Sequence, residues 1–360
     1  MAGRAGTATR ALAAALVVTG VLVATVAGTP AGPVGAATGA ARDGTDAGRP
    51  VGVVTRTFVD RTRKTPADVS AAITPAPQRV LPTTIYYPAR GTAVAGSVTR
   101  GAKPAGGVHP LILFNPGSPG TPEDYEVLLA DWAAHGYVVA APEFPISSVA
   151  GPDDVAWKDL PQQTKDARFV LDHVLDLDAG KVGIPEIDAE RIAAAGHSFG
   201  GATALSLAST CCRDDRIDVT LALAAVVRTE HGPALRHPHG PVLFVHARGD
   251  RAVSYTAAAA LCEKQAGTPK RLLTVEGIRG LRAHVTPYLG SDEYAALVRP
   301  AIVEFLDGYL RGDRAARDRL DHAGEGTTTG AVTRCRPGDE PTAPTGTTPT
   351  TTAFGPRTGD

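Results

Sequence analysis

Short apolar runs alternate with amphipathic stretches through the middle of the chain, and no other feature restricts the fold as strongly. Apolar runs typical of strands lie at residues 51–59, 80–87, 111–114, 137–141, 192–195, 219–227, 242–245 and 272–275. Apolar side chains recur at helical spacing in 122–135, 163–177, 202–209, 256–266 and 293–310. Strands that alternate with helices need crossover connections, which make neighbouring strands parallel and cover both faces of the sheet. The sequence therefore predicts an α/β fold, with a mostly parallel central sheet and helices on both faces.

The segment after the strand at 192–195 carries a motif that predicts a nucleophile. Gly196-His197-Ser198-Phe199-Gly200 matches G-x-S-x-G, with an apolar strand directly before it and a helix of small residues after it. A serine in this context lies on a sharp, strained turn, where side chains in place of the two glycines would clash with the neighbouring strand and helix. The start of the helix also offers backbone N–H groups near the reacting oxygen. We therefore interpret Ser198 as a nucleophile, in preference to an incidental turn serine.

A serine hydroxyl attacks only when a base removes its proton, and the base needs a carboxylate that orients it. After a nucleophile of this kind the usual chain order is acid and then histidine. Asp250 follows the strand at 242–245 and His284 follows the strand at 272–275, and we expect both to lie in loops. The sequence thus predicts the triad Ser198, Asp250 and His284. Glu230, which follows the strand at 219–227, stays open as an alternative acid.

An oxyanion formed at the attacked carbonyl needs two N–H donors. The residue after the nucleophile, Phe199, supplies one of them. The other is expected from the loop after the strand at 111–114, where Pro116 and Pro119 have no N–H. Of the remaining donors, at Gly117, Ser118 and Gly120, we predict that of Ser118.

These residues carry a resemblance to the α/β-hydrolase superfamily. Within it the chain is similar to secreted bacterial esterases related to dienelactone hydrolases, cutinase-like polyesterases, platelet-activating-factor acetylhydrolases and chlorophyllases. The resemblance covers about residues 50–312. It rests on TTIYYP at 83–88, LILF at 111–114, AHGYVVAAP at 134–142, AGHSFGGAT at 195–203 and DRAVSY at 250–255.

The resemblance implies a serine carboxylic ester hydrolase that works through an acyl-enzyme, without a cofactor or a metal. The chain departs from the family at Pro116-Gly117, where His-Gly is common, and before His284, where Gly280 lies four residues upstream instead of three. Two alternative functions on the same fold stay open for this chain. It could be a non-catalytic extracellular binding protein, or a peptidase or acyltransferase.

The two ends of the chain differ in composition from its middle. Residues 11–28 are apolar and uncharged, follow Arg4 and Arg10, and precede small residues around Ala36. This pattern predicts a signal peptide over 1–36 and hence a secreted protein, with a membrane anchor as the alternative. Residues 37–49 are expected to be a disordered linker and residues 50–322 the catalytic domain. The Thr/Pro-rich stretch at 323–360 is expected to be a disordered tail, because it has few apolar side chains to bury.

The net charge limits the classes of partner that we expect, and the cysteine content limits the disulfides. The 36 basic and 37 acidic residues nearly cancel, which argues against nucleic acid as a partner. We expect a monomer without stable membrane insertion, acting on a small-molecule, lipid or polyester ester. The four cysteines allow two disulfides if the protein is exported. Because adjacent cysteines seldom bond to each other, Cys211 and Cys212 are expected to pair with Cys262 and Cys335.

Overall fold

The computed structural model describes residues 48–67, 73–91, 98–149, 153–227, 238–263, 269–290 and 293–335. The predicted signal peptide, and with it the prediction of export, lies outside these residues.

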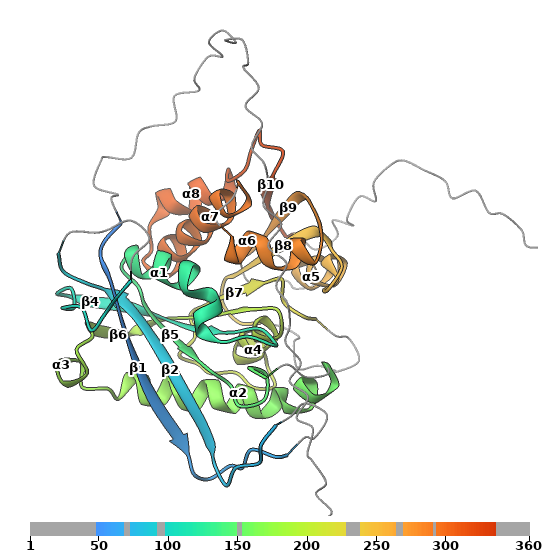
Figure 1. Ribbon diagram of the computed structural model, residues 1–360. Coiled ribbons are helices and arrows are strands. Elements are labelled where there is room, and N and C mark those ends of the chain that lie inside the picture. Colours follow the sequence, from blue (N-terminus) through green and yellow to red (C-terminus); the bar gives the residue numbers. More distant parts are fainter. Residues whose placement is uncertain are drawn as a thin grey trace, which may run out of the picture. The chain divides into compact units, whose positions relative to one another are not determined.

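Ten strands form one sheet within these ranges (Figure 1). They are β1 (Val51–Asp60), β2 (Arg79–Pro88), β3 (Val98–Arg100), β4 (Val108–Asn115), β5 (Val138–Pro142), β6 (Glu186–His197), β7 (Val219–Leu223), β8 (Val242–Asp250), β9 (Lys270–Gly280) and β10 (Gly330–Arg334). Their order across the sheet is β10-β9-β8-β7-β6-β4-β5-β2-β1-β3. All pairs from β5 through β4, β6, β7 and β8 to β9 are parallel, whereas β2 pairs antiparallel with β1 and β5, and β10 pairs antiparallel with β9.

In the described residues, helices lie in the connections from β4 to β5, β5 to β6, β6 to β7 and β8 to β9, as crossovers between parallel strands require, and further helices follow β9. In chain order, the helices are the short 3-10 helix η1 (Pro122–Tyr125), α1 (Glu126–Ala134), α2 (Asp153–Leu175), α3 (Ala179–Val182), α4 (Phe199–Ala208), α5 (Tyr255–Glu263), α6 (Leu281–Leu289), α7 (Glu293–Leu310) and α8 (Arg314–Asp321). The predicted strands and the helices at 122–135, 163–177, 202–209, 256–266 and 293–310 have counterparts here. Helices α3, α6 and α8 and strands β3 and β10 were not predicted.

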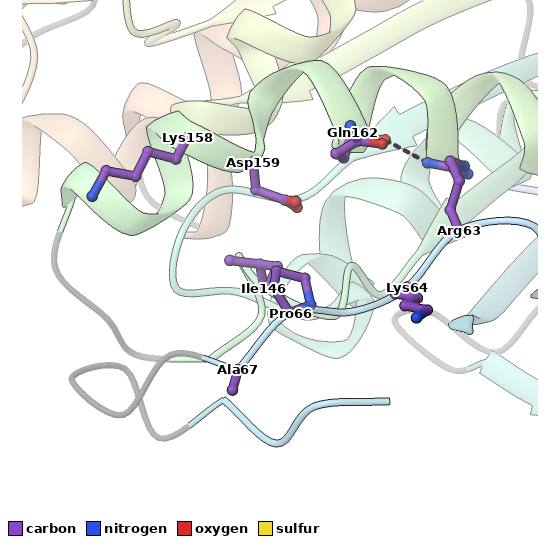
Figure 2. A pocket seen from close by; sticks show the side chains of 8 residues that line it. All are labelled: Arg63, Lys64, Pro66, Ala67, Ile146, Lys158, Asp159 and Gln162. Atoms are coloured by element: carbon purple, nitrogen blue, oxygen red, sulfur yellow. Dashed lines mark hydrogen bonds between the residues drawn. The ribbon is translucent and has the colours of Figure 1, made fainter. Parts of the chain in front are cut away.

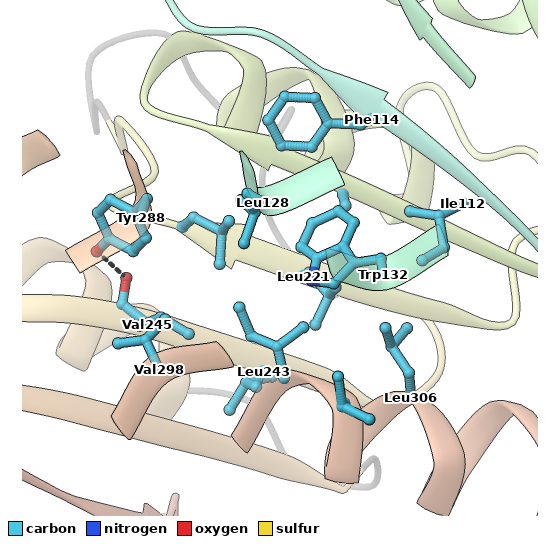
Figure 3. Close-up of a cluster of buried hydrophobic side chains, with 14 of the residues drawn as sticks. Ile112, Phe114, Leu128, Trp132, Leu221, Leu243, Val245, Tyr288, Val298 and Leu306 are labelled. Carbon is cyan, nitrogen blue, oxygen red and sulfur yellow. Dashed lines mark hydrogen bonds between the residues drawn. The ribbon is translucent and has the colours of Figure 1, made fainter. Parts of the chain in front are cut away.

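Both faces of the sheet are buried, which explains why its central strands are continuously apolar. On β4, Ile112 and Phe114 pack with helices α1, α6 and α7, and the alternating Leu111 and Leu113 pack with α2 and α4 on the other face. Figure 3 shows the first of these clusters, where side chains of the strands meet Trp132 of α1. The predicted α/β-hydrolase fold, a mostly parallel sheet with helices on both faces, is confirmed.

A buried ion cluster joins the second strand to the longest helix. Arg79 on β2 is fully buried and donates hydrogen bonds to Asp159 and Asp166 of α2, with Nε 2.8 Å from Asp166 Oδ1 and Nη2 2.8 Å from Asp159 Oδ2. Arg63 adds a second contact to Asp166, at 2.8 Å. Charges removed from water need such partners, so this cluster fixes α2 against the sheet.

Strand β10 corrects the expected start of the tail. The segment from residue 323 to 360 has Val332 as its single aliphatic side chain larger than alanine, which is why its composition predicted a disordered tail. The structure pairs Gly330–Arg334 with Arg271–Val275 of β9, and Val332 is buried. Backbone hydrogen bonds of the ladder thus order a segment that has little apolar area of its own.

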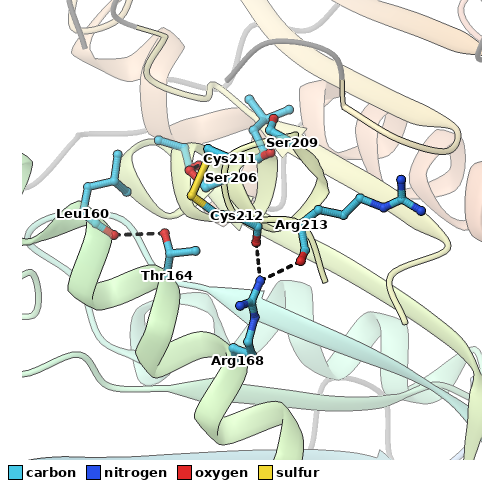
Figure 4. Close-up of a disulfide and its surroundings, with 10 residues drawn as sticks. Leu160, Thr164, Arg168, Ser206, Ser209, Cys211, Cys212 and Arg213 are labelled. Atoms are coloured by element: carbon cyan, nitrogen blue, oxygen red, sulfur yellow. Dashed lines mark hydrogen bonds between the residues drawn. A yellow bond between two sulfur atoms is a disulfide. The ribbon is translucent and has the colours of Figure 1, made fainter. Parts of the chain in front are cut away.

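The disulfide pairing also differs from the prediction. Cys262 on α5 bonds to Cys335 after β10, across a Cα–Cα distance of 5.5 Å. Cys211 bonds to its neighbour Cys212 in the turn after α4 (Figure 4). The expectation that each adjacent cysteine reaches a distant one is therefore wrong. The sheet edge brings Cys335 beside α5, where Cys262 lies buried, while Arg168 donates hydrogen bonds to the backbone carbonyls of Cys212 and Arg213.

The two disulfides are expected to contribute very differently to stability. Cys335→Ser opens a link between residues 73 positions apart, and we expect it to lower the free energy of unfolding by about 2–4 kcal/mol. The matched variant Cys211→Ser opens a link between adjacent residues, which constrains almost no loop in the unfolded chain. Urea unfolding followed by tryptophan fluorescence measures both. Equal losses in the two variants would contradict this account.

Candidate active site

Ser198 lies at the turn between β6 and α4, at the carboxyl edge of the parallel strands. Its φ is 54° and its ψ is −119°, a backbone conformation that L-residues rarely adopt. Hydrogen bonds hold the strained residue on both sides. Its N–H donates to the carbonyl of Leu223, at 2.8 Å, and its carbonyl accepts from the N–H of Val226, at 3.0 Å. The surrounding strands therefore impose the conformation that presents the side chain at the edge of the sheet.

The glycines of the motif are required by close backbone contacts. A Cβ at Gly196 would overlap the carbonyl oxygen of Gly200. A Cβ at Gly200 would overlap the carbonyl oxygen of Asn115, at the end of β4. The turn after β6 can be this tight only because both positions lack a side chain, which is the reason proposed for them from the sequence.

The structure brings the three predicted catalytic residues into one chain of hydrogen bonds. His284 Nε2 lies 3.0 Å from Ser198 Oγ, and His284 Nδ1 lies 2.8 Å from Asp250 Oδ2. All three are screened from solvent, with Ser198 8% and His284 7% exposed. Because the carboxylate accepts from Nδ1–H, the lone pair on Nε2 faces the serine hydroxyl. The hydroxyl therefore donates to His284, as a serine that loses its proton to a base must.

The prediction that both Asp250 and His284 lie in loops is wrong, because Asp250 is the last residue of β8 and His284 lies on helix α6. Asp250 ends β8 and pairs with Gly280 in the register of β8 and β9. Gly280 has a φ of 71° and directly precedes α6, so the chain turns there and places His284 one helical turn later beside the carboxylate. The alternative acid, Glu230, lies outside the described residues.

Asp250 is held as an ionised carboxylate. Its Oδ1 accepts hydrogen bonds from the backbone N–H groups of Ala252 and Val253, at 2.8 and 3.0 Å. Burial by itself raises the pKa of Asp250. Hydrogen bonds from the side chains of His246 and His284 and from the N–H of Val253 outweigh burial, so the pKa is well below its usual range. The carboxylate is therefore charged wherever the protein is folded at neutral pH.

The predicted oxyanion donors lie on the two segments that face the serine. Phe199 begins α4, and the first N–H groups of a helix have no acceptor within it. The loop after β4 approaches from the other side, since a Cβ at Gly117 would lie 3.2 Å from Ser198 Cβ. The N–H of Gly117 donates to Tyr125 Oη, at 3.0 Å, and is thereby engaged. Ser118, the next residue of this loop, is half-buried.

Two further side chains of the site were not predicted. Tyr125 Oη lies 2.9 Å from Nδ1 of His197, and His197 Nε2 lies 2.9 Å from the backbone carbonyl of His284. The apolar spacing of 122–135 indicated only a packing role for Tyr125. His197 occupies a variable position of G-x-S-x-G, which carries no signal of its own. These contacts join residues 72 and 87 positions apart, beyond the reach of a local sequence pattern.

A separate cavity of about 540 Å³ lies beside α2 (Figure 2). Figure 2 shows Arg63 donating to the backbone carbonyl of Gln162, at 3.1 Å, with Ile146 and Pro66 nearby. None of Ser198, Asp250 and His284 lines this cavity, so it is not the place for their chemistry. In the ranges that the structure describes, no group of three or more His, Cys, Asp or Glu side chains could hold a metal ion. No helix in the same ranges is long and apolar enough to cross a membrane.

Two comparisons with known proteins bear on the fold and on the kind of reaction. Residues 91–230 match the family model described as Chlorophyllase. Among solved structures, the chain is similar to the ferulic acid esterase from Streptomyces cinnamoneus, with a TM-score of 0.54 and 27% sequence identity. That match covers 73% of this chain and 91% of the esterase. Together with the sheet topology, the two matches confirm the resemblance to esterases of the α/β-hydrolase superfamily, and they support an enzyme that hydrolyses ester bonds.

Proposed function

We propose that this member of the α/β-hydrolase superfamily is a serine carboxylic ester hydrolase, with Ser198 as nucleophile, His284 as base and Asp250 as the orienting acid. The observation that carries the proposal is the unbroken chain from Ser198 Oγ through His284 to Asp250, with distances of 3.0 and 2.8 Å. Its strained serine, its imidazole acceptor and its ionised carboxylate are the parts that nucleophilic ester cleavage needs.

The reaction proceeds in two halves. Ser198 Oγ bonds to the ester carbonyl carbon while its proton passes to His284 Nε2, and the carbonyl oxygen becomes an oxyanion that accepts from the N–H groups of Phe199 and Ser118. The carbon–oxygen bond to the alcohol then breaks, and the alcohol leaves with the proton from His284. Water repeats the sequence on the acyl-enzyme and releases the carboxylic acid with the serine restored.

Asp250 acts on both halves through His284. It accepts from Nδ1–H, which keeps the Nε2 lone pair directed at the serine, and it stabilises the imidazolium that forms when the proton arrives. The carboxylate stays charged because its pKa is held low by His246, His284 and the N–H of Val253.

The proposed substrate class and location rest on composition, on one similar structure and on the first residues of the chain. A chain with a net charge of −1 and 5% aromatic residues suits small or medium apolar acyl esters. Because one similar structure is a ferulic acid esterase, hydroxycinnamate esters belong among the candidates. The signal-like stretch before residue 36 supports secretion, and we propose that the mature enzyme acts as a monomer without a cofactor.

Covalent labelling combined with ester hydrolysis tests the proposal. The folded protein is expected to hydrolyse p-nitrophenyl esters or methyl ferulate, and to lose this activity as one fluorophosphonate adduct forms on Ser198, located by mass spectrometry of the digested protein. Heat-unfolded protein is the control and should remain unlabelled, because the serine is activated only by its folded neighbours. Labelling at another serine would refute the nucleophile. A folded protein that neither labels nor hydrolyses would favour a binding protein, and labelling with amide cleavage or acyl transfer alone would favour the other activities of this fold.

A further inference from the structure

His197 and Tyr125 connect two parts of the site that the triad does not connect. The Gly117 N–H donates to Tyr125 Oη at 3.0 Å, and Tyr125 Oη lies 2.9 Å from His197 Nδ1. On the other side of the ring, His197 Nε2 lies 2.9 Å from the carbonyl oxygen of His284. The path therefore runs from the loop that carries Ser118 to the backbone of the proposed base.

The direction of every hydrogen bond in this path is determined by its ends. A carbonyl oxygen only accepts, so His197 Nε2 carries the hydrogen and Nδ1 is an acceptor. Tyr125 must then donate its hydroxyl hydrogen to Nδ1, which leaves its oxygen to accept from the N–H of Gly117. Each donor therefore faces an acceptor along the path, and successive hydrogen bonds in such a chain polarise and strengthen one another.

The surroundings of His197 keep the path in this single state. Burial lowers the pKa of His197 to about 3, assisted by the nearby His284, so that the imidazole is neutral. The groups around it are Tyr125 from η1, His284 and Tyr288 from α6, and Asp250 and His246 from β8, with the Tyr288 ring centroid at 5.0 Å. Burial also raises the pKa of Tyr125, which remains a neutral hydroxyl.

We propose that Tyr125 and His197 are positioning residues that form a hydrogen-bond relay between the oxyanion loop and the backbone of His284. This inference rests on the proposed ester hydrolase function of the site. The relay binds the Gly117 N–H, so that Gly117 fixes the loop and Ser118 supplies the oxyanion donor. It also restrains α6 at the residue that must stay within reach of Ser198 Oγ.

Tyr125→Phe tests the relay with little change in shape. The phenyl ring fills the same space but leaves the Gly117 N–H and His197 Nδ1 without their partner. We expect kcat for ester hydrolysis to fall about 10- to 100-fold, because misplacement of a site by a fraction of an ångström to an ångström has effects of this order. KM should change less than about threefold, and the affinity for a boronic acid that mimics the tetrahedral intermediate should fall in parallel with kcat/KM.

The matched control is Tyr137→Phe. This variant also removes the hydroxyl of a buried tyrosine, which donates to Asp307 of α7 at 2.6 Å, and it should keep its kcat and its boronic acid affinity. Thermal unfolding of both variants separates lost stability from lost positioning. An unchanged kcat and boronic acid affinity in Tyr125→Phe, with only a lower melting temperature, would overturn the relay.

Variants of His197, the residue that contacts Tyr125, supply two more comparisons. His197→Phe removes both contacts, whereas His197→Gln presents an acceptor and a donor and should retain more activity. Since the relay acts as a unit, Tyr125→Phe combined with His197→Phe should be no slower than His197→Phe alone. Losses in kcat that multiply in the double variant would show that the two residues act independently.

A readout without substrate distinguishes failure of the relay from failure of the proposed function. NMR of the histidine ring nitrogens should show His197 as the neutral Nε2–H tautomer, without titration between about pH 5 and pH 8. The Nδ1 resonance should shift in Tyr125→Phe. An inert enzyme with these signals would refute only the hydrolase function. A titrating His197, or its Nδ1–H tautomer, would refute the relay in an active enzyme as well.

Discussion

Ser198→Ala should reduce kcat for ester hydrolysis by about 10⁴- to 10⁶-fold, which is the range seen when a serine nucleophile is removed from a triad. Alanine leaves His284 with nothing to deprotonate and leaves the ester carbonyl without an attacking oxygen. The backbone turn survives, because Ser198 is held through its N–H and carbonyl and not through its side chain. Steady-state kinetics on one p-nitrophenyl ester, with the secondary structure checked by circular dichroism, measures the loss.

The matched control for this prediction is Ser206→Ala on the same helix, α4. Its hydroxyl donates to the carbonyl of Ala202, at 2.8 Å, so its removal should leave kcat unchanged. Asp250→Asn should cost about 10⁴-fold in kcat, because an amide no longer selects the tautomer of His284. If Ser198→Ala keeps more than a few per cent of the activity, the nucleophile is misassigned. If Glu230→Gln instead of Asp250→Asn abolishes activity, the acid is misassigned.

Arg79→Met should lower the free energy of unfolding by about 3–5 kcal/mol, the cost of removing one partner from a buried ion cluster. Arg79 is fully buried, and its loss strands the carboxylate of Asp159, while Asp166 keeps only Arg63. The matched control is Arg191→Met, which breaks an ion pair with Asp188 where the arginine side chain is 52% exposed. Exposed pairs contribute about 1 kcal/mol or less. Urea unfolding of both variants measures the difference, and a loss near that of the control would contradict a cluster that fixes α2.

The loss in free energy of unfolding caused by Arg79→Met, called the deficit below, should become larger as the pH rises. Burial raises the pKa of Asp159, and the hydrogen bonds from Arg79 oppose this in the wild-type protein. Without Arg79 the folded-state pKa exceeds the unfolded value of about 3.9, so protonation favours the folded state. Stability of the variant is therefore retained at low pH and lost as the pH rises through the folded-state pKa. The deficit should be smaller near pH 5 than near pH 8, and Asp159→Asn added to Arg79→Met should recover part of it.

Local sequence patterns predicted the order of the strands and helices more completely than the arrangement of the candidate site. Alternating apolar runs predicted the sheet, because strands buried on both faces must be apolar throughout. The turn from β6 to α4 that carries Ser198, here called the elbow, could be predicted from Gly196 and Gly200, since only glycine fits where backbones approach this closely. Asp250 and His284 were predicted from their order along the chain and their places after two strands. Their contact depends on the register of β8 and β9 and on α6, which the sequence did not reveal because Pro287 interrupts its helical pattern.

The features that were missed depend on distant partners. Cys262 reaches Cys335 only because β10 completes the sheet edge, and that strand is ordered by its ladder and not by its own side chains. The contact of His197 with Tyr125 needs η1 and the elbow to converge, and no spacing rule links them. A local sequence pattern predicts which face of a segment is buried and where the chain turns. It does not predict which polar atoms from distant segments come into contact.

Strand β10 determines how far the carboxyl end can be shortened before the protein is expected to self-associate. A chain shortened to residue 322, where the domain seemed to end by composition, would lose β10 and with it the bond from Cys262 to Cys335. Strand β9 would then present an open row of backbone donors and acceptors, which is a template for association with other chains. Strand β10 therefore protects the edge of β9 from self-association, and a shortened chain should keep the sequence through Cys335.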